Sequence, residues 1–372
     1  MSDNIIETLV DSSIDSLKLL CKISKPFFRW LFDGYLPEEK PDFDILWKEL
    51  KVKNSIDNYP ILFKENNGYY SKTYMFTIPY GLCIDDFIYN KNRIAQFLKC
   101  DIKNIRIELV NGLVAITIYD LSKLSFDYQD YKFDYNTKEL RVPLGIDLKT
   151  YAPVYWRPCE NTNAHAGIYG ATGSGKSVCL NTILYYLCQR KDVDIYLNDT
   201  KCSDLFLFEK YAESYTDGTD YIEETASLIV DLMNKRYELL KSKHCRNINE
   251  LKKDKPNYIF FVIEEFSSFN VKEYPDLFKS LDLILSKGRA AGVFVIIVSQ
   301  TVYSTLLPGN LKSNISTSIC FRQKTQEASK VTTGDYMKAV SLRGQGHGLL
   351  ITNEEIEFQS FYIHDDIIKS LK

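Results

Sequence analysis

Long apolar runs mark the second half of the chain. Residues 258–263 read Tyr-Ile-Phe-Phe-Val-Ile and residues 293–298 read Val-Phe-Val-Ile-Ile-Val. Strands that helices cover on both faces have this pattern, which is typical of parallel sheets. Stretches with helical spacing separate the runs, so we predict a parallel sheet with crossover helices. Its expected strands are residues 166–169, 194–197, 258–263, 293–298 and 316–321.

A smaller α/β unit is expected before this sheet. Residues 70–78 alternate between apolar and polar positions as a strand does, and residues 85–99 have helical spacing. Two further apolar runs, residues 105–110 and 113–119, flank an Asn-Gly pair. An Asn-Gly pair between two such runs is a strong signal of a β-hairpin.

The amino-terminal residues follow a different pattern. Residues 17–32 mix large apolar side chains with basic ones, which fits either an amphipathic helix on a membrane surface or a helix docked on the protein or a neighbouring subunit. Pro26 interrupts this stretch and favours docking. Residues 36–41 contain two prolines and are expected to be a linker. The predicted parts are a helical extension, a small α/β domain and a larger α/β domain, residues 1–60, 61–150 and 151–372.

Composition and charge narrow the class of protein. Hydrophobic residues make up 45% of the 372 residues, which is ample for packed cores, and the formal net charge is -3. That charge argues against a surface covered by nucleic acid everywhere, but it permits a local basic strip or the inside of a ring. The nine cysteines include no Cys-x-x-Cys pair and indicate neither a disulfide framework nor a zinc site. We therefore expect the reducing cytoplasm.

The sequence also bears on membranes. It begins Met-Ser-Asp-Asn, without the basic residues that open a signal peptide. No apolar run approaches the roughly 20 residues that span a bilayer. The expected location is cytoplasmic, with membrane association only through a partner.

Residues 170–177 read Gly-Ala-Thr-Gly-Ser-Gly-Lys-Ser, the pattern of a P-loop, between an expected strand and a helix expected over residues 177–189. The glycines let the backbone aim its N–H groups at phosphate, at the positive end of the helix. Lys176 would neutralise the β and γ oxygens of ATP, and the Ser177 hydroxyl would bind Mg²⁺. A flexible Gly-Ser linker is not expected, because rigid elements flank the segment. The expected nucleotide-binding residues are Gly170, Ala171, Thr172, Gly173, Ser174, Gly175, Lys176, Ser177 and Val178.

This motif makes the predicted fold an α/β P-loop NTPase of the RecA-like type, with helices flanking a parallel sheet. Glu264 and Glu265 directly follow the apolar run 258–263, so they would stand at the carboxyl end of a central strand, beside the P-loop. We expect Glu264 to join the Mg²⁺ shell, through Ser177 or water, and Glu265 to polarise the attacking water. Two solvated acids at a strand end are the alternative.

Three more polar residues are candidates for the same chemistry. Gln300 follows the run 293–298 and would sense the γ-phosphate or the water, unless it is a plain strand end. Arg289, before that run, and Arg322, after the last expected strand, are candidate arginine fingers. An ordinary surface salt bridge is the alternative for each arginine.

With these motifs the chain resembles the FtsK/SpoIIIE family of DNA-pumping ATPases, within the HerA-FtsK group of ring motors. The resemblance extends over roughly residues 70–363 and leaves the first 60 or so residues unmatched. Besides the P-loop, the similar segments are residues 142–147, 198–201, 235–239, 246–248, 263–266, 288–292, 299–300, 321–322 and 344–346. The chain departs from the family at Glu264, where the family has Asp, so we expect retained but slower hydrolysis. The membrane segment and winged-helix DNA reader of the large members are not found, so sequence-directed travel is not expected.

The resemblance implies a hexameric ring that threads double-stranded DNA, with ATP between subunits and an arginine supplied by the neighbour. Lys330, Lys338 and Arg343 follow the last expected strand, where the pore loops of the family occur. Contacts to DNA phosphates need only Lys or Arg, so these three are the candidate DNA-binding residues, with a solvated loop as the alternative. The basic residues 241–255 are a weaker candidate, for which a solvated face is favoured.

The predicted function is an ATP-driven translocase of double-stranded DNA, which acts in the transfer or replication of a plasmid, phage or conjugative element. A relaxase, a replication protein or a membrane protein would recruit it. Two alternatives stay open. One is a secretion motor of the same superfamily that moves protein, and the other is an ATP-dependent coupling or assembly factor.

Overall fold

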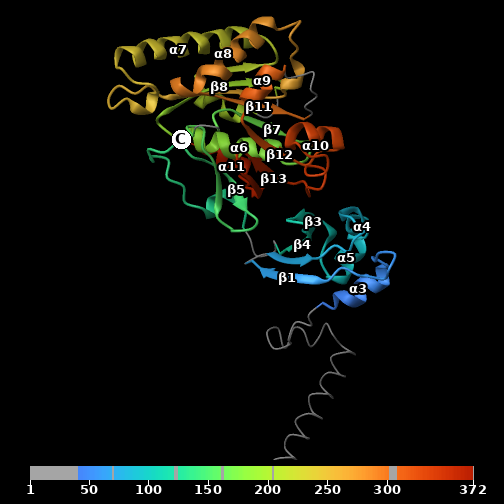
Figure 1. Cartoon of the computed structure of the whole chain (residues 1–372). Helices are drawn as coiled ribbons and strands as arrows, with labels where there is room; N and C mark the ends of the chain where they lie inside the picture. The colour runs from blue at the N-terminus through green and yellow to red at the C-terminus, as the bar shows by residue number, and fades with distance from the viewer. Residues whose placement is uncertain are drawn as a thin grey trace, which may run out of the picture. The chain divides into compact units, whose positions relative to one another are not determined.

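The computed structural model describes residues 41–68, 71–120, 125–160, 163–202, 205–300 and 308–371 (Figure 1). The chain divides after Lys51, and the residues on either side of this point are described separately. Before it lies α3 (Phe43–Leu50), whose first turn is capped by Asp42. The Asp42 carboxylate accepts hydrogen bonds from the backbone N–H groups of Asp44 and Ile45, at 3.1 and 3.3 Å. The helix predicted over residues 17–32 lies outside the described residues, and so do residues 36–40 of the predicted linker.

After Lys51 the chain first forms a four-stranded antiparallel sheet in the order β1-β2-β4-β3. Its strands are β1 (Leu62–Asn67), β2 (Ser71–Phe76), β3 (Ile105–Val110) and β4 (Leu113–Tyr119). The predicted hairpin is confirmed, and Asn111 and Gly112 at its turn both have positive φ, 51° and 77°. A two-residue turn between twisted strands requires this conformation, which Asn and Gly adopt most easily. The predicted strand at residues 70–78 is β2, and β1 was not predicted.

The helical prediction for residues 85–99 is confirmed, although the residues do not form one continuous helix. The structure has two short helices there, α4 (Ile84–Tyr89) and α5 (Lys91–Phe97), which meet at Asn90. The Asn90 side chain donates to the carbonyl oxygen of Asp86 at 2.9 Å. Asn competes with regular helix by making such local hydrogen bonds, so the apolar spacing continues across a break in the backbone.

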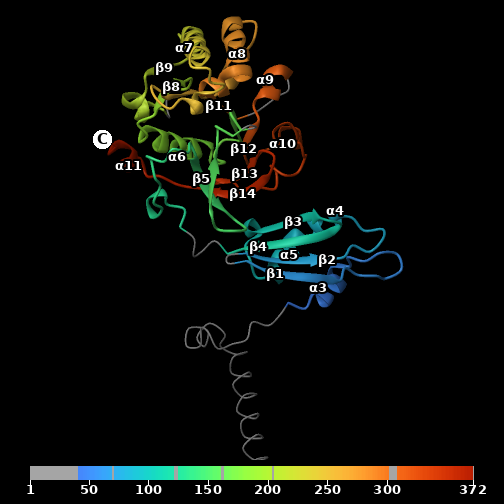
Figure 2. The same ribbon diagram turned by 60° about the vertical axis from the view of Figure 1, so that its left-hand side comes forward.

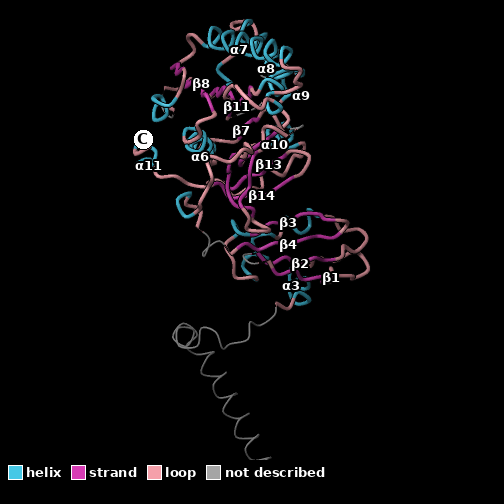
Figure 3. Tube along the Cα trace, turned by 90° about the vertical axis from the view of Figure 1, so that its left-hand side faces the viewer, coloured by secondary structure: helices cyan, strands magenta, loops and turns pink. Residues whose placement is uncertain are grey.

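A ten-stranded sheet follows, in the order β6-β5-β14-β13-β12-β7-β11-β10-β8-β9 (Figure 3). The strands from β12 to β9 are parallel, as predicted, and the other four are antiparallel additions. The strands are β5 (Val142–Asp147), β6 (Pro153–Trp156), β7 (Ala166–Tyr169), β8 (Val193–Asp199), β9 (Ser214–Asp217), β10 (Tyr258–Ile263), β11 (Val293–Ser299), β12 (Thr317–Phe321), β13 (His347–Ile351) and β14 (Glu355–Ser360).

Helices cover both faces of this sheet (Figure 2). Phe260 and Val262 of β10 share a core with residues of α6, and the alternate residues of β10, such as Phe261, share another core with α7 and α8. Burial on both faces explains why the predicted strands read as continuous apolar runs. Within the described ranges, no helix has both the length and the apolar character of a membrane span. The helices are α6 (Lys176–Cys188), α7 (Ile222–Ser242), α8 (Pro275–Ala291), α9 (Gly309–Asn314), α10 (Gln326–Thr333) and α11 (Asp365–Lys369).

Candidate active site

The P-loop connects the end of β7 to the start of α6. Gly173 and Gly175 have φ of +75° and +113°, a region that side chains disfavour. A Cβ on Gly175 would lie 2.5 Å from the Cα of Gly346, and a Cβ on Gly170 would lie 2.6 Å from the Ser174 Oγ. These positions therefore require glycine, both for the backbone turn and for its close approach to neighbouring segments.

Hydrogen bonds from two neighbouring strand ends hold the P-loop. The Ala171 N–H donates to the carbonyl of Arg322 at 2.9 Å, just after β12. The Gly346 N–H donates to the carbonyl of Ser174 at 2.8 Å, just before β13. The Ser174 Oγ is buried and has no hydrogen-bond partner in the structure. The loop is thus a supported backbone turn, as a phosphate cradle has to be.

Lys176 is the first residue of α6, and Ser177 and Val178 follow it in the first turn. The Lys176 Nζ donates to the Ala171 carbonyl at 3.3 Å, which directs the ammonium group back across the loop. The amino end of a helix carries unpaired N–H groups and positive potential. Loop, lysine and helix end together present the donors that bind phosphate oxygens.

Glu264 and Glu265 follow β10 at the same edge of the sheet, where the parallel strands end. The Glu264 N–H continues the ladder by donating to the Asn198 carbonyl at 3.0 Å, and its side chain is buried. Glu265 adopts the left-handed conformation, with φ 48°, so the chain turns sharply out of the strand there. The two carboxyl groups therefore leave the strand end in different backbone environments.

Three side chains bind the Glu265 carboxylate. Oε2 lies 2.7 Å from the Lys201 Nζ and accepts from the Gln300 Nε2 at 2.9 Å, and Oε1 accepts from the Ser267 hydroxyl. Burial by itself raises the pKa of Glu265, but the hydrogen bonds from Lys201 and Ser267 outweigh it and lower the pKa below its ordinary value. Glu265 is consequently a buried, ionised group.

Gln300 connects this carboxylate to the tip of the P-loop. Its Oε1 accepts a hydrogen bond from the Thr172 Oγ1 at 2.8 Å while its Nε2 donates to Glu265. The structure therefore brings the predicted residues Thr172, Gln300 and Glu265 into one chain of contacts. Lys201 extends that chain but was not predicted as a site residue. Its position just after β8, a strand that pairs in parallel with β10, was the signal for it.

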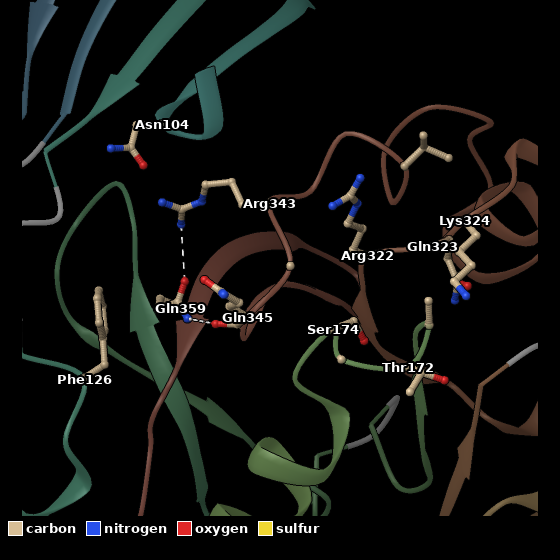
Figure 4. Close-up of a pocket in the computed structure, with 14 residues that line it drawn as sticks. Asn104, Phe126, Thr172, Ser174, Arg322, Gln323, Lys324, Arg343, Gln345 and Gln359 are labelled. Atoms are coloured by element: carbon tan, nitrogen blue, oxygen red, sulfur yellow. Dashed lines mark hydrogen bonds between the residues drawn. The ribbon is translucent and has the colours of Figure 1, made fainter. Parts of the chain in front are cut away.

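A pocket of about 770 Å³ borders the P-loop (Figure 4). Residues 171–174 form one wall, and Arg322, Lys324 and Arg343 contribute three cations. Among the residues that the structure describes, no carboxylate lines it. The pocket suits an anionic ligand, and its size is that of a small-molecule site.

The two candidate arginine fingers occupy different places. Arg322 follows β12 and lines the pocket beside the P-loop of its own chain. Arg289 is exposed in the last turn of α8, which leads into the start of β11. The starts of the parallel strands form the edge of the sheet opposite the P-loop, so the structure does not bring Arg289 to the site of its own chain.

The three predicted DNA-binding residues are also spread out. Lys330, in the last turn of α10, donates to the carbonyl of Gly334 just after this helix, at 2.7 Å. Lys338 pairs with Glu355 at 2.5 Å, at the start of β14, whereas Arg343 bonds to Gln359 at 3.3 Å, near the end of β14. Lys338 and Arg343 thus lie toward opposite ends of the β13–β14 hairpin, and Arg343 is the one beside the P-loop.

Two bacterial DNA translocases are similar to this chain in sequence. The DNA translocase SftA of Bacillus subtilis is 31% identical over 240 residues, which is 60% of this chain and 24% of SftA. The DNA translocase FtsK of Chlamydia muridarum is 26% identical over 285 residues, 69% of this chain and 36% of that protein. The chain therefore matches about a quarter to a third of the length of these relatives.

Two solved structures share the fold. The monomer form of the pCW3 conjugation coupling protein TcpA with ATPγS has a TM-score of 0.61 at 22% identity, over 88% of this chain and 97% of that one. EssC, ATPases 2 and 3, from Geobacillus thermodenitrificans has a TM-score of 0.55 at 21% identity, over 62% of this chain and 46% of that one. The predicted P-loop ATPase fold is confirmed.

The family model of FtsK/SpoIIIE matches residues 123–308, which is half of the 372 residues. This range contains the P-loop, both glutamates and Gln300. The resemblance predicted from the motifs is confirmed, and the chain belongs to the FtsK/SpoIIIE family.

Proposed function

We propose that this chain is an ATP-driven translocase of double-stranded DNA that works as a hexameric ring. The observation that carries the proposal is the chain of contacts from Thr172 at the P-loop tip through Gln300 to Glu265. It joins the phosphate-binding loop to the acid that would orient water. Relatives that are named DNA translocases support DNA as the substrate.

The P-loop would bind the phosphates of ATP. Gly175 lies so close to Gly346 that it has no room for a side chain, so the backbone N–H groups of the loop stay accessible to phosphate. Lys176, at the start of α6, adds a positive charge beside these donors. Ser177 and Glu264 would hold Mg²⁺, because a hydroxyl and a carboxylate are the oxygen donors that this ion takes. When bound, Mg²⁺ would supply charge neutralisation on the phosphate oxygens.

Glu265 would orient the attacking water and take up its proton. In the structure its carboxylate is engaged by Lys201, Ser267 and Gln300, so it has to exchange one of these contacts to reach a water. Gln300 is suited to trigger the exchange, because a phosphate that draws Thr172 toward itself would also pull on Gln300. Hydrolysis would then depend on how the P-loop is filled.

In a ring of subunits, Arg289 and Arg322 would act on different ATP molecules. Arg289, exposed and remote from its own P-loop, is suited to reach the ATP of a neighbouring subunit, whereas Arg322 is suited to its own. Lys330 and Lys338 are exposed or half-exposed and would contact DNA phosphates. We further propose a cytoplasmic protein of a mobile element, recruited by a relaxase, a replication protein or a membrane partner. The division into residues 1–60, 61–150 and 151–372 also stays a proposal.

The test is the ATPase rate measured with double-stranded DNA, with single-stranded DNA and without DNA. We expect the largest stimulation by double-stranded DNA, and no activity above background for Lys176→Ala under any condition. Absence of stimulation by either nucleic acid would contradict the proposal. Stimulation by a peptide substrate would then indicate a secretion motor, and nucleotide binding with negligible turnover a coupling or assembly factor.

A further inference from the structure

A buried polar cluster surrounds Glu357 of β14. Its carboxylate binds the guanidinium of Arg106 on β3 and accepts from the Tyr119 hydroxyl on β4 at 2.9 Å. Its other oxygen, Oε1, lies 2.6 Å from the Nε2 of His347 on β13. The side chains of Glu357 and His347 are 2% and 4% exposed, so the contacts are shielded from water. A buried charge of this kind is costly unless every partner is in place.

The hydrogen bonds of His347 define its protonation. Its Nδ1 accepts from the backbone N–H of Arg343 at 3.1 Å and from the Arg343 Nε at 2.9 Å. Since Nδ1 is an acceptor, the proton is on Nε2 and is donated to Glu357. Burial lowers the pKa of His347, which keeps the ring neutral. Glu357 therefore selects the tautomer that can hold Arg343.

These contacts fix Arg343 at one end of the pocket, where its guanidinium extends toward Gln359 on the side away from Ser174 of the P-loop (Figure 4). His347 holds its Nε, and the Tyr119 ring lies 5.6 Å from its guanidinium carbon. Gln359 accepts from its Nη2 at 3.3 Å (Figure 4). Arg343 lines the pocket together with Ser174 of the P-loop. Gly346, three residues on, is bonded to that same serine. A guanidinium fixed at two nitrogens, in a pocket that no carboxylate of the described residues lines, is held ready for the anionic oxygens of a ligand that extends from the P-loop to this end of the pocket.

We propose that Arg343 binds the nucleotide, and that His347, held by Glu357, is the residue that positions it. This inference rests on the proposed function in one respect, that the P-loop takes a nucleoside triphosphate. Arg343 reaches the pocket from the segment just before β13, whereas Glu265 is bound by Lys201, Ser267 and Gln300, so we assign Arg343 to the part of the nucleotide that ADP and ATP share. In this proposal Arg343 has a different role from Lys330 and Lys338 and contacts the nucleotide in place of the DNA expected from the sequence.

The first test is equilibrium binding of ADP and of ATPγS to the full chain. Arg343→Ala should weaken both about ten-fold or more, the effect of losing one charge-assisted hydrogen bond. Lys279→Ala, on the exposed surface of α8, is the matched control and should bind as the unaltered chain does. Equal affinities for Arg343→Ala and the unaltered chain would overturn the proposal. A loss for ATPγS alone would overturn its assignment to the shared part of the nucleotide.

The second test separates positioning from folding. His347→Asn keeps an acceptor where Nδ1 stands, whereas His347→Gln keeps the reach toward Glu357 and loses the Arg343 contact. Both variants lose the buried ring, so thermal unfolding should show similar destabilisation. Nucleotide affinity should fall in His347→Gln and be largely retained in His347→Asn. Adding Arg343→Ala to His347→Gln should cause no further loss beyond that of Arg343→Ala.

Equal affinities in the two His347 variants, or losses that multiply in the double variant, would overturn the positioning role. If His347→Gln does not fold, Tyr119→Phe removes one hydrogen bond from Glu357 and should lower affinity only when Arg343 is present. Failure of the proposed function would give a different result from failure of this inference. A chain that binds nucleotide through Arg343 without stimulation by DNA would contradict the translocase and leave this inference intact.

Discussion

The side-chain amide of Gln300 donates to the Glu265 carboxylate at 2.9 Å. Gln300 directly follows β11, and Glu265 turns out of β10, the strand that pairs with β11. Because Thr172 bonds to the other end of the same amide, the acid and the P-loop tip share one intermediate. The relationship places the state of the phosphate site within two hydrogen bonds of the group that would activate water.

Lys176→Ala should reduce ATP hydrolysis by at least about 100-fold, because it removes a charge that would face the phosphates. Nucleotide binding should weaken as well. The fold should persist, since the ammonium group reaches back to the P-loop itself, where it donates to the Ala171 carbonyl. Hydrolysis is measured beside a thermal unfolding curve, and turnover at the unaltered rate would contradict the P-loop assignment.

The two glutamates should respond differently to loss of charge. Glu265→Gln should lower hydrolysis about 100-fold or more while ATP still binds, so the variant should accumulate as closed rings on DNA. Glu264→Gln should mainly raise the Mg²⁺ concentration that hydrolysis requires. Mass measurements in solution and a Mg²⁺ titration check both. A normal rate in Glu265→Gln with a dead Glu264→Gln would reverse the two roles.

Gly175→Ala should destabilise the P-loop. The added Cβ would meet the backbone of Gly346, and φ of +113° strains any side chain, which together cost about 1–3 kcal/mol. Nucleotide affinity should fall with it. Gly309→Ala is the matched control, because nothing lies within 4 Å of a Cβ there and its effect should stay within about 0.5 kcal/mol. Similar unfolding curves for the two variants would contradict the packing described.

Lys201→Ala should change the pH dependence of hydrolysis. The Lys201 ammonium is a main cause of the lowered pKa of Glu265, so its removal raises that pKa toward, or through burial above, the ordinary range. Protonated Glu265 cannot accept a proton from water. The acidic limb of the kcat/KM profile should therefore move to higher pH. An unmoved acidic limb would mean that Glu265 is not the group that titrates there.

The sequence pattern predicted the centre of the large sheet but not its margins. The bounds of β7 and β10 agree with the predicted ranges, because burial on both faces leaves continuous apolar runs such as residues 258–263. β1 was missed because its residues are mostly exposed on both faces and do not alternate. The antiparallel pairing of β5 with β14 joins residues more than 200 positions apart, for which a local pattern holds no signal.

The candidate site divides in the same way. The P-loop, Glu264, Glu265 and Gln300 were predictable, because each follows a recognisable strand and the carboxyl ends of parallel strands meet at one edge. The partners of Arg343 were not, since Arg106, His347 and Glu357 look like ordinary polar residues in the sequence. Only long-range pairing brings Arg106 of β3 to Glu357 of β14. Lys201 lay within a segment similar to the family, but its contact with Glu265 needed the structure.

Translocation itself is measured most directly by displacement of a third strand from linear double-stranded DNA. The motor is added with ATP and Mg²⁺, and release of the triplex-forming strand is followed over time for duplexes of increasing length. We predict release that depends on ATP, with a delay that grows with duplex length, and none with Lys176→Ala or Glu265→Gln. Release that is independent of ATP, or no release despite rapid ATP hydrolysis on the same DNA, would contradict the account.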